Sequence, residues 1–343
     1  MAHSRNGSPS AAVDPDVTRR RVSPTSKFTL ALLGLVLAAL TAFVLLQSGL
    51  GPLPDPERCV ARADGSAAAL DLEQAENAAV IAGVAVRRGL PARAVTIALA
   101  TAYQESDIRN VGYGDRDSLG VFQQRPSQGW GTAEQVQDLH YAANRFYDEL
   151  VGIDGYRDLP ITDAAQQVQR SAFGDAYADH EPEARIVASA LTGYSQAAFS
   201  CSVRLGSADD QDTGANGLTP RANAVLTDVQ QTFGELPVGG FQPGGVTSGH
   251  MEGSAHYDGR AVDIFFRPVT EENRRQGWAV AHYLVARADR LGIQTVIFDD
   301  RIWQSGSDSD AGWRDYRAPT SSGDTTVLQH RDHVHVDVVE SSG

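Results

Sequence analysis

Three stretches of the chain differ in how apolar and polar residues follow one another. Residues 28–46 are nineteen residues without a charged side chain, rich in Leu, Ala and Val. Between residues 72 and 191, apolar residues recur at the spacing of amphipathic helices. Beyond residue 220, helical spacing gives way in places to short apolar runs that are typical of strands, such as "IQTVIFDD" and "HVHVDVV". These patterns predict a multidomain protein: a single N-terminal transmembrane helix, an all-α domain and an α+β domain.

The predicted elements set the domain boundaries. In the middle stretch we expect helices over residues 73–90, 91–106, 133–150, 163–171 and 181–191. The all-α domain then covers residues 60–202, and residues 203–220 have the Gly-, Asp- and Ser-rich composition of a linker. The α+β domain takes residues 221–343, with helices expected over 221–236 and 270–292.

The apolar run predicts how the chain meets a membrane. Residues 28–47, at 1.5 Å per residue, approach the thickness of a bilayer core. Arg19, Arg20, Arg21 and Lys27 precede the run, so residues 1–27 would be a disordered cytoplasmic tail and the rest of the chain would lie outside the cytoplasm. A cleaved signal peptide and a buried soluble helix are the alternatives, and the first also leaves residues 50–343 extracytoplasmic.

Charge and cysteine content narrow the function classes. The formal charge is −14, and residues 1–27 carry five basic and two acidic residues, so the remainder carries −17. Such an acidic surface argues against nucleic-acid binding, which depends on clustered Lys and Arg. Cys59 and Cys201 are the two cysteines, and an even number outside the membrane permits a disulfide that would clasp the all-α domain. Two free buried thiols are the alternative.

Histidines gather in the last third of the chain, where six of the nine follow residue 249. In "HVHVDVV", strand alternation places His333, His335 and Asp337 on one face and three valines on the other. A catalytic zinc ion takes three protein ligands and keeps a position for water, whose pKa it lowers. His256, Asp263 and one of the paired histidines would supply such a set.

The segment around His256 resembles a known family of zinc peptidases. It matches the Ser-x-His-x-x-Gly-x-Ala-x-Asp motif of the peptidoglycan D-Ala-D-Ala carboxypeptidase group, within the lysostaphin-type and D-Ala-D-Ala metallopeptidase superfamily, at Ser254, His256, Gly259, Ala261 and Asp263. The later His-x-His and acid-x-x-His motifs are both present in Asp332-His333-Val334-His335. The resemblance covers about residues 240–340.

This resemblance implies a role for each residue. His256, Asp263 and His335 would bind Zn²⁺, Asp332 would be the general base, and His333 would stabilise the oxyanion. The family more often has Glu as the base, and the usual Trp before the final His is absent. The alternative is a set of unrelated histidines on surface strands. Three other histidines match nothing in the family and are expected to be structural or surface residues: His250, His282 and His330.

A second resemblance lies in the helical domain, over residues 72–195. "AYQES" ends an apolar helix and "SLGVFQQ" follows, as in soluble lytic transglycosylases and goose-type lysozymes, with matches at Glu105, Ser106, Ser118, Gly120 and Gln123. Glu105 would be the general acid, with its pKa raised by a pocket of Tyr103, Phe122 and Trp130. Ser118 and Gln123 would bind the glycan. Val121 and Phe122 replace the usual Leu and Met, and Asp115 and Asp117 lie nearby without an assigned role.

Alternatives remain for the helical domain and for the whole chain. Glu105 could be an ordinary solvated glutamate, or the domain a degenerate glycan-binding module. The two resemblances together imply a bifunctional peptidoglycan hydrolase that cuts glycan strands and wall peptides. The alternatives are a wall-binding scaffold with one or both sites inactive, and a zinc hydrolase of another secreted peptide.

Overall fold

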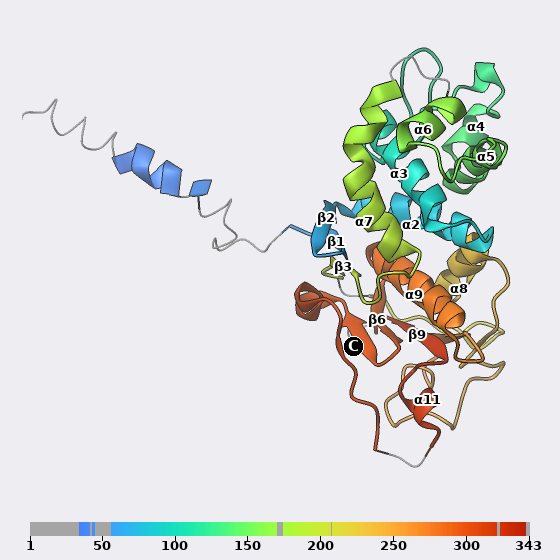
Figure 1. The fold of residues 1–343 in the computed structure, drawn as a ribbon. Helices are drawn as coiled ribbons and strands as arrows, with labels where there is room; N and C mark the ends of the chain where they lie inside the picture. The colour runs from blue at the N-terminus through green and yellow to red at the C-terminus, as the bar shows by residue number, and fades with distance from the viewer. Residues whose placement is uncertain are drawn as a thin grey trace, which may run out of the picture. The chain divides into compact units, whose positions relative to one another are not determined.

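The computed structural model describes residues 34–41, 43–44, 56–169, 174–206, 208–320 and 323–340. The chain divides into two units, Met1–Pro56 and Glu57–Gly343 (Figure 1). In the first unit, residues 34–41 and 43–44 are helical and exposed. The predicted tail, residues 1–27, lies outside the described residues.

The predicted transmembrane helix over residues 28–47 is wrong. Among the residues that the structure describes, no helix is both long enough and apolar enough to cross a membrane. Within this stretch, the residues described as helical are 34–41 and 43–44. Residues 28–33, 42 and 45–47 of that stretch lie outside the described residues.

The prediction of an all-α domain over residues 60–202 is also wrong. This part of the chain, the first half of the second unit, contains three strands as well as helices. Two strands, β1 (Arg58–Ala63) and β2 (Ser66–Leu70), form a hairpin, and β3 (Phe199–Ser202) pairs antiparallel with the other edge of β1. Asp64 and Gly65 in the turn both have positive φ, 50° and 77°, as the tight Asp-Gly hairpin turn requires. Along the chain, the helices lie between β2 and β3. They are α2 (Leu72–Arg87), α3 (Ala92–Ser106), α4 (Ala133–Gln137), α5 (Leu139–Val151), α6 (Ile161–Gln169) and α7 (Glu181–Leu191), with two short 3-10 helices, η1 (Pro126–Gln128) and η2 (Gly174–His180).

The second half is built around a six-stranded antiparallel sheet in the order β4-β5-β9-β6-β7-β8. Its strands are β4 (Val238–Gly239), β5 (Ala261–Phe265), β6 (Ile293–Phe298), β7 (Arg301–Gln304), β8 (Arg314–Asp315) and β9 (His333–Val338). Its helices are α8 (Pro220–Phe233), α9 (Glu271–Ala286), α10 (Ala288–Leu291) and α11 (Thr325–Leu328), together with the 3-10 helix η3 (Gly306–Ala311).

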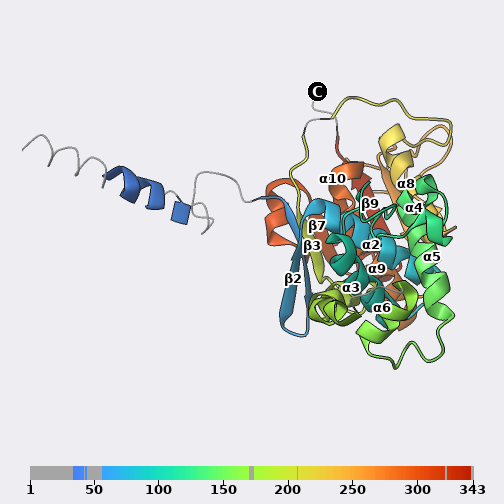
Figure 2. The ribbon, with the colours of Figure 1, turned by 90° about the horizontal axis from the view of Figure 1, so that it is seen from above.

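The two halves share one core. Helices α8 and α9 pack against α2 of the first half, and Figures 1 and 2 show the three side by side. At this junction the buried Arg287 pairs with Asp228 at 2.7 Å and with Glu76 at 3.1 Å. In the expected linker, Val203 and Leu218 are buried. The chain from Glu57 onward is therefore one compact unit, not separate bodies joined by a free linker.

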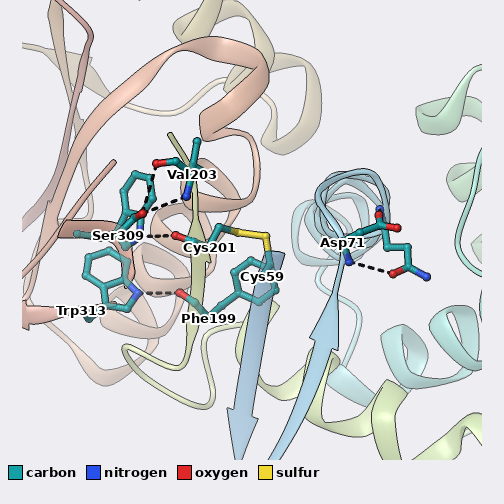
Figure 3. The surroundings of a disulfide bond; sticks show 9 residues. Cys59, Asp71, Phe199, Cys201, Val203, Ser309 and Trp313 are labelled. Atoms are coloured by element: carbon teal, nitrogen blue, oxygen red, sulfur yellow. Dashed lines mark hydrogen bonds between the residues drawn. A yellow bond between two sulfur atoms is a disulfide. The ribbon is translucent and has the colours of Figure 1, made fainter. Parts of the chain in front are cut away.

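The predicted disulfide is confirmed, and it lies at the same junction. Cys59 and Cys201 are directly paired across β1 and β3 and are both buried (Figure 3). The indole N–H of Trp303 donates to the carbonyl of Cys201 at 3.2 Å, and that of Trp313 donates to the carbonyl of Phe199 at 2.7 Å. Strand β3 thus connects the disulfide of the first half to tryptophans of the second.

Candidate functional site

Sheet register brings the predicted ligands of the second half together. Strands β5 and β9 pair so that Asp263 lies directly opposite His335. The valines of β9 are buried in the core, so His333 and His335 project from the opposite face of the strand. His256 reaches the same place from the loop that precedes β5.

Three ligand atoms converge there. His335 Nδ1 lies 3.1 Å from His256 Nε2 and 3.1 Å from Asp263 Oδ1, and the third side of this triangle measures 3.3 Å. Ligands at the usual zinc distances in a tetrahedral site are about 3.3 Å apart. All three side chains are buried.

The outer hydrogen bonds of the two histidines decide which nitrogens face this point. His256 Nδ1 donates to the carbonyl oxygen of Gly240 at 2.7 Å, since a carbonyl can only accept. His335 Nε2 lies 3.2 Å from Asp337 Oδ2, to which it donates. Both inner nitrogens then present lone pairs to each other and to a carboxylate oxygen, an arrangement that requires a shared proton or a metal ion between them. Oriented outer-shell acceptors of this kind are typical of zinc-binding histidines.

The electrostatics also favour a cation. Burial alone lowers the pKa of His335, but the carboxylates of Asp263 and Asp337 on either side raise it to about 10. Burial would raise the pKa of Asp263, but the adjacent imidazoles of His256 and His335 hold it well below its usual range. The cluster therefore retains positive charge at neutral pH, as a proton or as a bound cation.

Position 240 requires a glycine because its backbone lies close to the side chains of His256 and Asp263. Its φ is +78°, and a Cβ at this position would lie 2.3 Å from His256 Cε1 and 3.0 Å from Asp263 Oδ2. The backbone of Gly240 therefore lies directly against the ligands, where any side chain would displace the imidazole.

His250 also lies in this cluster, although its sequence context predicted a structural or surface role. His250, His256 and Asp263 each offer a ligand atom within 4.8 Å of the others, so they could hold a metal ion. The rings of His250 and His256 are stacked, with centroids 3.9 Å apart. The only sequence signal was its place six residues before His256 in a Gly-rich segment.

The other two unassigned histidines differ from each other. The ring of His330 lies 4.6 Å from that of His333 and 5.7 Å from that of His335, beside the cluster. His282 is fully buried on α9, where it bonds the carbonyl of Ala190 and the N–H of Ala198. Burial lowers the pKa of His282 to about 4, consistent with a structural role.

Asp332 is already engaged by other side chains. Its Oδ1 lies 2.8 Å from His333 Nδ1, and its Oδ2 accepts from Arg267 Nε at 2.6 Å. Burial would raise its pKa, but these two partners hold the pKa below its ordinary value. His333 Nε2, by contrast, lies 3.9 Å from Asp263 Oδ1, facing the three converging ligands.

A second site lies in the first half, around Glu105 in the last turn of α3. Tyr177 donates its hydroxyl to Glu105 Oε1 at 2.6 Å, and the side chain of Gln169 forms a further hydrogen bond. Burial raises the pKa of Glu105, and these two hydrogen bonds oppose the shift. Glu105 is thus a half-buried carboxyl group, not a freely solvated one.

The segment after α3 is held to this helix by its own hydrogen bonds. Ser106 Oγ donates to the carbonyl of Val121 at 2.7 Å. Gly120 has φ +76°, and a Cβ there would lie 2.6 Å from the carbonyl oxygen of Val136. Ser118 is buried, and Gln123 donates its amide N–H to carbonyls of its own segment at 3.1 and 3.2 Å.

The aromatic residues expected around Glu105 each contact another side chain. Phe122 is fully buried and stacks on Phe146 in the core, with centroids 4.6 Å apart. Tyr103 stacks on His180 at 5.5 Å, and Trp130 lies under Arg145 at 6.0 Å. Of the nearby carboxylates, Asp117 is bound by Arg125 and Ser127, and Asp115 lies near Arg116 on the surface.

Comparison with known families adds one finding. The family model "VldE, C-terminal domain" matches residues 214–327. That segment includes His250, His256 and Asp263 and ends before β9, which carries His333 and His335. The match covers about a third of the chain. The search of curated proteins found no match to this chain.

Proposed function

We propose that this protein is a peptidoglycan hydrolase with two sites: a zinc peptidase centre at His256, Asp263 and His335, and a glycan-cleaving site at Glu105. The observation that carries the proposal is the triangle of two imidazole nitrogens and one carboxylate oxygen, 3.1–3.3 Å on each side. These donors and their spacing fit zinc. Zinc, when bound, would supply a Lewis acid that polarises a peptide carbonyl and lowers the pKa of a coordinated water.

The protein's own residues would orient the ligands and move the proton. Gly240 and Asp337 fix the ring orientations of the two histidines through their outer nitrogens. We assign the proton transfer to His333 instead of Asp332, because His333 Nε2 faces the ligands whereas Asp332 is held by Arg267 and His333. Asp332 keeps the proton on His333 Nδ1, so that Nε2 is free to accept a proton and then donate it to the leaving amine.

Glu105 would protonate the glycosidic oxygen of a glycan strand. A carboxyl group can donate a proton near neutral pH only if its pKa is raised, and burial acts in this direction at Glu105. The hydrogen bonds from Tyr177 and Gln169 hold the carboxyl group of Glu105 in one orientation. Ser118 and Gln123 remain the proposed glycan-binding residues.

Both sites act on bonds of one polymer, which is why we combine them. Peptidoglycan contains glycan strands cross-linked by short peptides, and the substrate is therefore outside the cytoplasm. The buried disulfide is consistent with an oxidising, extracytoplasmic compartment.

Digestion of purified sacculi tests this proposal. The wild type should release both glycan-cleaved and peptide-cleaved fragments, identified by mass spectrometry. Glu105→Gln should abolish the glycan cleavage alone, and His335→Ala should abolish the peptide cleavage together with bound zinc. A wild type that binds sacculi, releases no fragments and contains no zinc would instead support the scaffold alternative.

A further inference from the structure

We propose that His250 is a fourth protein ligand of the metal centre, and that it must leave before a substrate can be cut. This inference rests on the proposed zinc site and concerns its regulation. In this proposal, the loop between β4 and β5, residues 240–260, carries His250 to the metal and so blocks the coordination position that a water molecule would take.

The position of His250 is fixed by specific contacts with neighbouring residues. Its ring stacks on that of His256 at 3.9 Å, and its ligand atom lies within 4.8 Å of those of His256 and Asp263. Tyr257 holds the backbone on both sides of the ring: its hydroxyl accepts from the His250 N–H at 3.1 Å and donates to the His250 carbonyl at 2.6 Å. Because Tyr257 directly follows His256, the residue that positions His250 is anchored beside a ligand.

A fourth protein ligand would change what the metal ion can do. Three protein ligands leave a zinc ion one position for water, whereas four protein ligands make a closed, structural type of site. His256, Asp263 and His335 already supply three. With His250 bound as well, no water could be activated, so hydrolysis requires that the imidazole of His250 be exchanged for a water molecule.

The loop has the properties that such an exchange needs. Gly244, Gly245, Gly249 and Gly253 all have positive φ, and a Cβ at any of them would meet no atom within 4 Å. Met251, next to His250, has 55% of its surface exposed. The segment around His250 is thus loosely packed, whereas His256 is fixed by Gly240 and His335 is fixed in the central sheet. Of the four ligands, His250 is therefore the one that can be released.

X-ray absorption at the zinc edge of the zinc-loaded full chain tests the inference without reference to activity. The wild type should show three imidazoles and one carboxylate, and His250→Ala should show two imidazoles and an additional light-atom ligand. Competition with a chelator should give a zinc affinity at least about tenfold weaker in His250→Ala, since even outer-shell losses cost this much. Tyr257→Phe should fall between the two proteins, and His180→Ala, which removes a histidine from the first half, should match the wild type.

Each result separates this inference from the proposed function. Two imidazoles in both the wild type and His250→Ala, with equal affinities, would overturn the inference whether or not peptides are cut. Three imidazoles in a wild type that releases no peptide fragments would support the inference and refute the peptidase. A wild type that binds no zinc refutes both. An unchanged melting temperature of metal-free His250→Ala would show that the variant folds, and His250→Asn provides a second test if it does not.

Discussion

Asp337 accepts a hydrogen bond from Nε2 of His335 at 3.2 Å, two residues away on the same face of β9. This bond leaves Nδ1 of His335 facing Asp263 across the β5–β9 pair. The orientation of the His335 imidazole is therefore encoded in the alternation of a single strand. A shift of the register by one residue would turn both side chains away from the site.

Asp337→Asn should weaken zinc binding about 10- to 100-fold without unfolding the protein, because an amide is a poorer acceptor for the imidazole N–H. Zinc affinity measured by chelator competition checks this. Glu340→Gln is the matched control, since Glu340 lies just beyond the same strand and, among the ion pairs of the described residues, contacts Arg260 at 3.8 Å and none of the site residues. Equal affinities in the two variants would show that Asp337 does not orient the ligand.

Gly240→Ala should also reduce zinc affinity at least about tenfold, through a steric clash with His256. The control is Gly244→Ala, because Gly244 has a similar φ of +82° but open space around its Cβ position. Both substitutions introduce the same backbone strain, so the difference between them reports contact with the ligand. Similar metal affinities would place the Gly240 backbone away from the functional site.

Glycan cleavage should be lost as the pH rises through the pKa of Glu105, which burial raises above the ordinary value of about 4.3. The hydroxyl of Tyr177 stabilises the charged carboxylate, so Tyr177→Phe should raise this pKa further and move the alkaline limb of the pH profile upward. Rates of glycan cleavage between pH 4 and 9 measure the shift. Tyr194→Phe, at an exposed site, should leave the profile unchanged.

The same shift has a consequence for stability. A carboxyl group with a raised pKa in the folded state holds its proton at pH values where the unfolded chain has lost it, so its contribution to stability falls as the pH rises through that interval. Glu105→Gln should therefore remove part of the loss of stability between the unfolded and folded pKa values. A larger loss of stability over this interval in the variant than in the wild type would contradict the assigned sign.

The local patterns predicted those features that depend on short-range periodicity. Alternation in β9 and the spacing between His256 and Asp263 pointed to residues that the fold does bring together. His250 was missed because its position depends on loop backbone angles and on the hydroxyl of Tyr257, which have no periodic signal.

The errors have equally specific causes. Strand β2 is "SAAAL", and alanine favours helices, so only its pairing with β1, and that of β1 with the distant β3, makes it a strand. The single helix expected over residues 133–150 is interrupted at Asp138, whose side chain caps α5 by accepting from the N–H of Tyr141. The apolar run at residues 28–46 indicated a preference for an apolar environment, which does not fix the length of a helix.

Arg287→Ala should lower the free energy of unfolding by about 3–5 kcal/mol, because it leaves Asp228 and Glu76 without their buried partner. Arg290→Ala is the control: Arg290 contacts Glu76 at 3.8 Å but is mostly exposed, so its loss should cost less than about 1 kcal/mol. Urea unfolding curves measure both values. Equal losses would mean that the buried pairs of Arg287 contribute no more to stability than the exposed contact of Arg290.

Removal of the disulfide should destabilise both halves at once. The bond closes a loop of 142 residues, for which the chain-entropy model gives about 5 kcal/mol. The sequence alone suggested a clasp on the helical domain. In the structure, however, the carbonyls that accept from Trp303 and Trp313 belong to Cys201 and Phe199 on β3. The double variant Cys59→Ser, Cys201→Ser should therefore show one calorimetric transition at a lower temperature, accompanied by loss of the near-ultraviolet signal of these tryptophans. Two separated transitions, with only the first shifted, would show instead that β3 does not couple the halves.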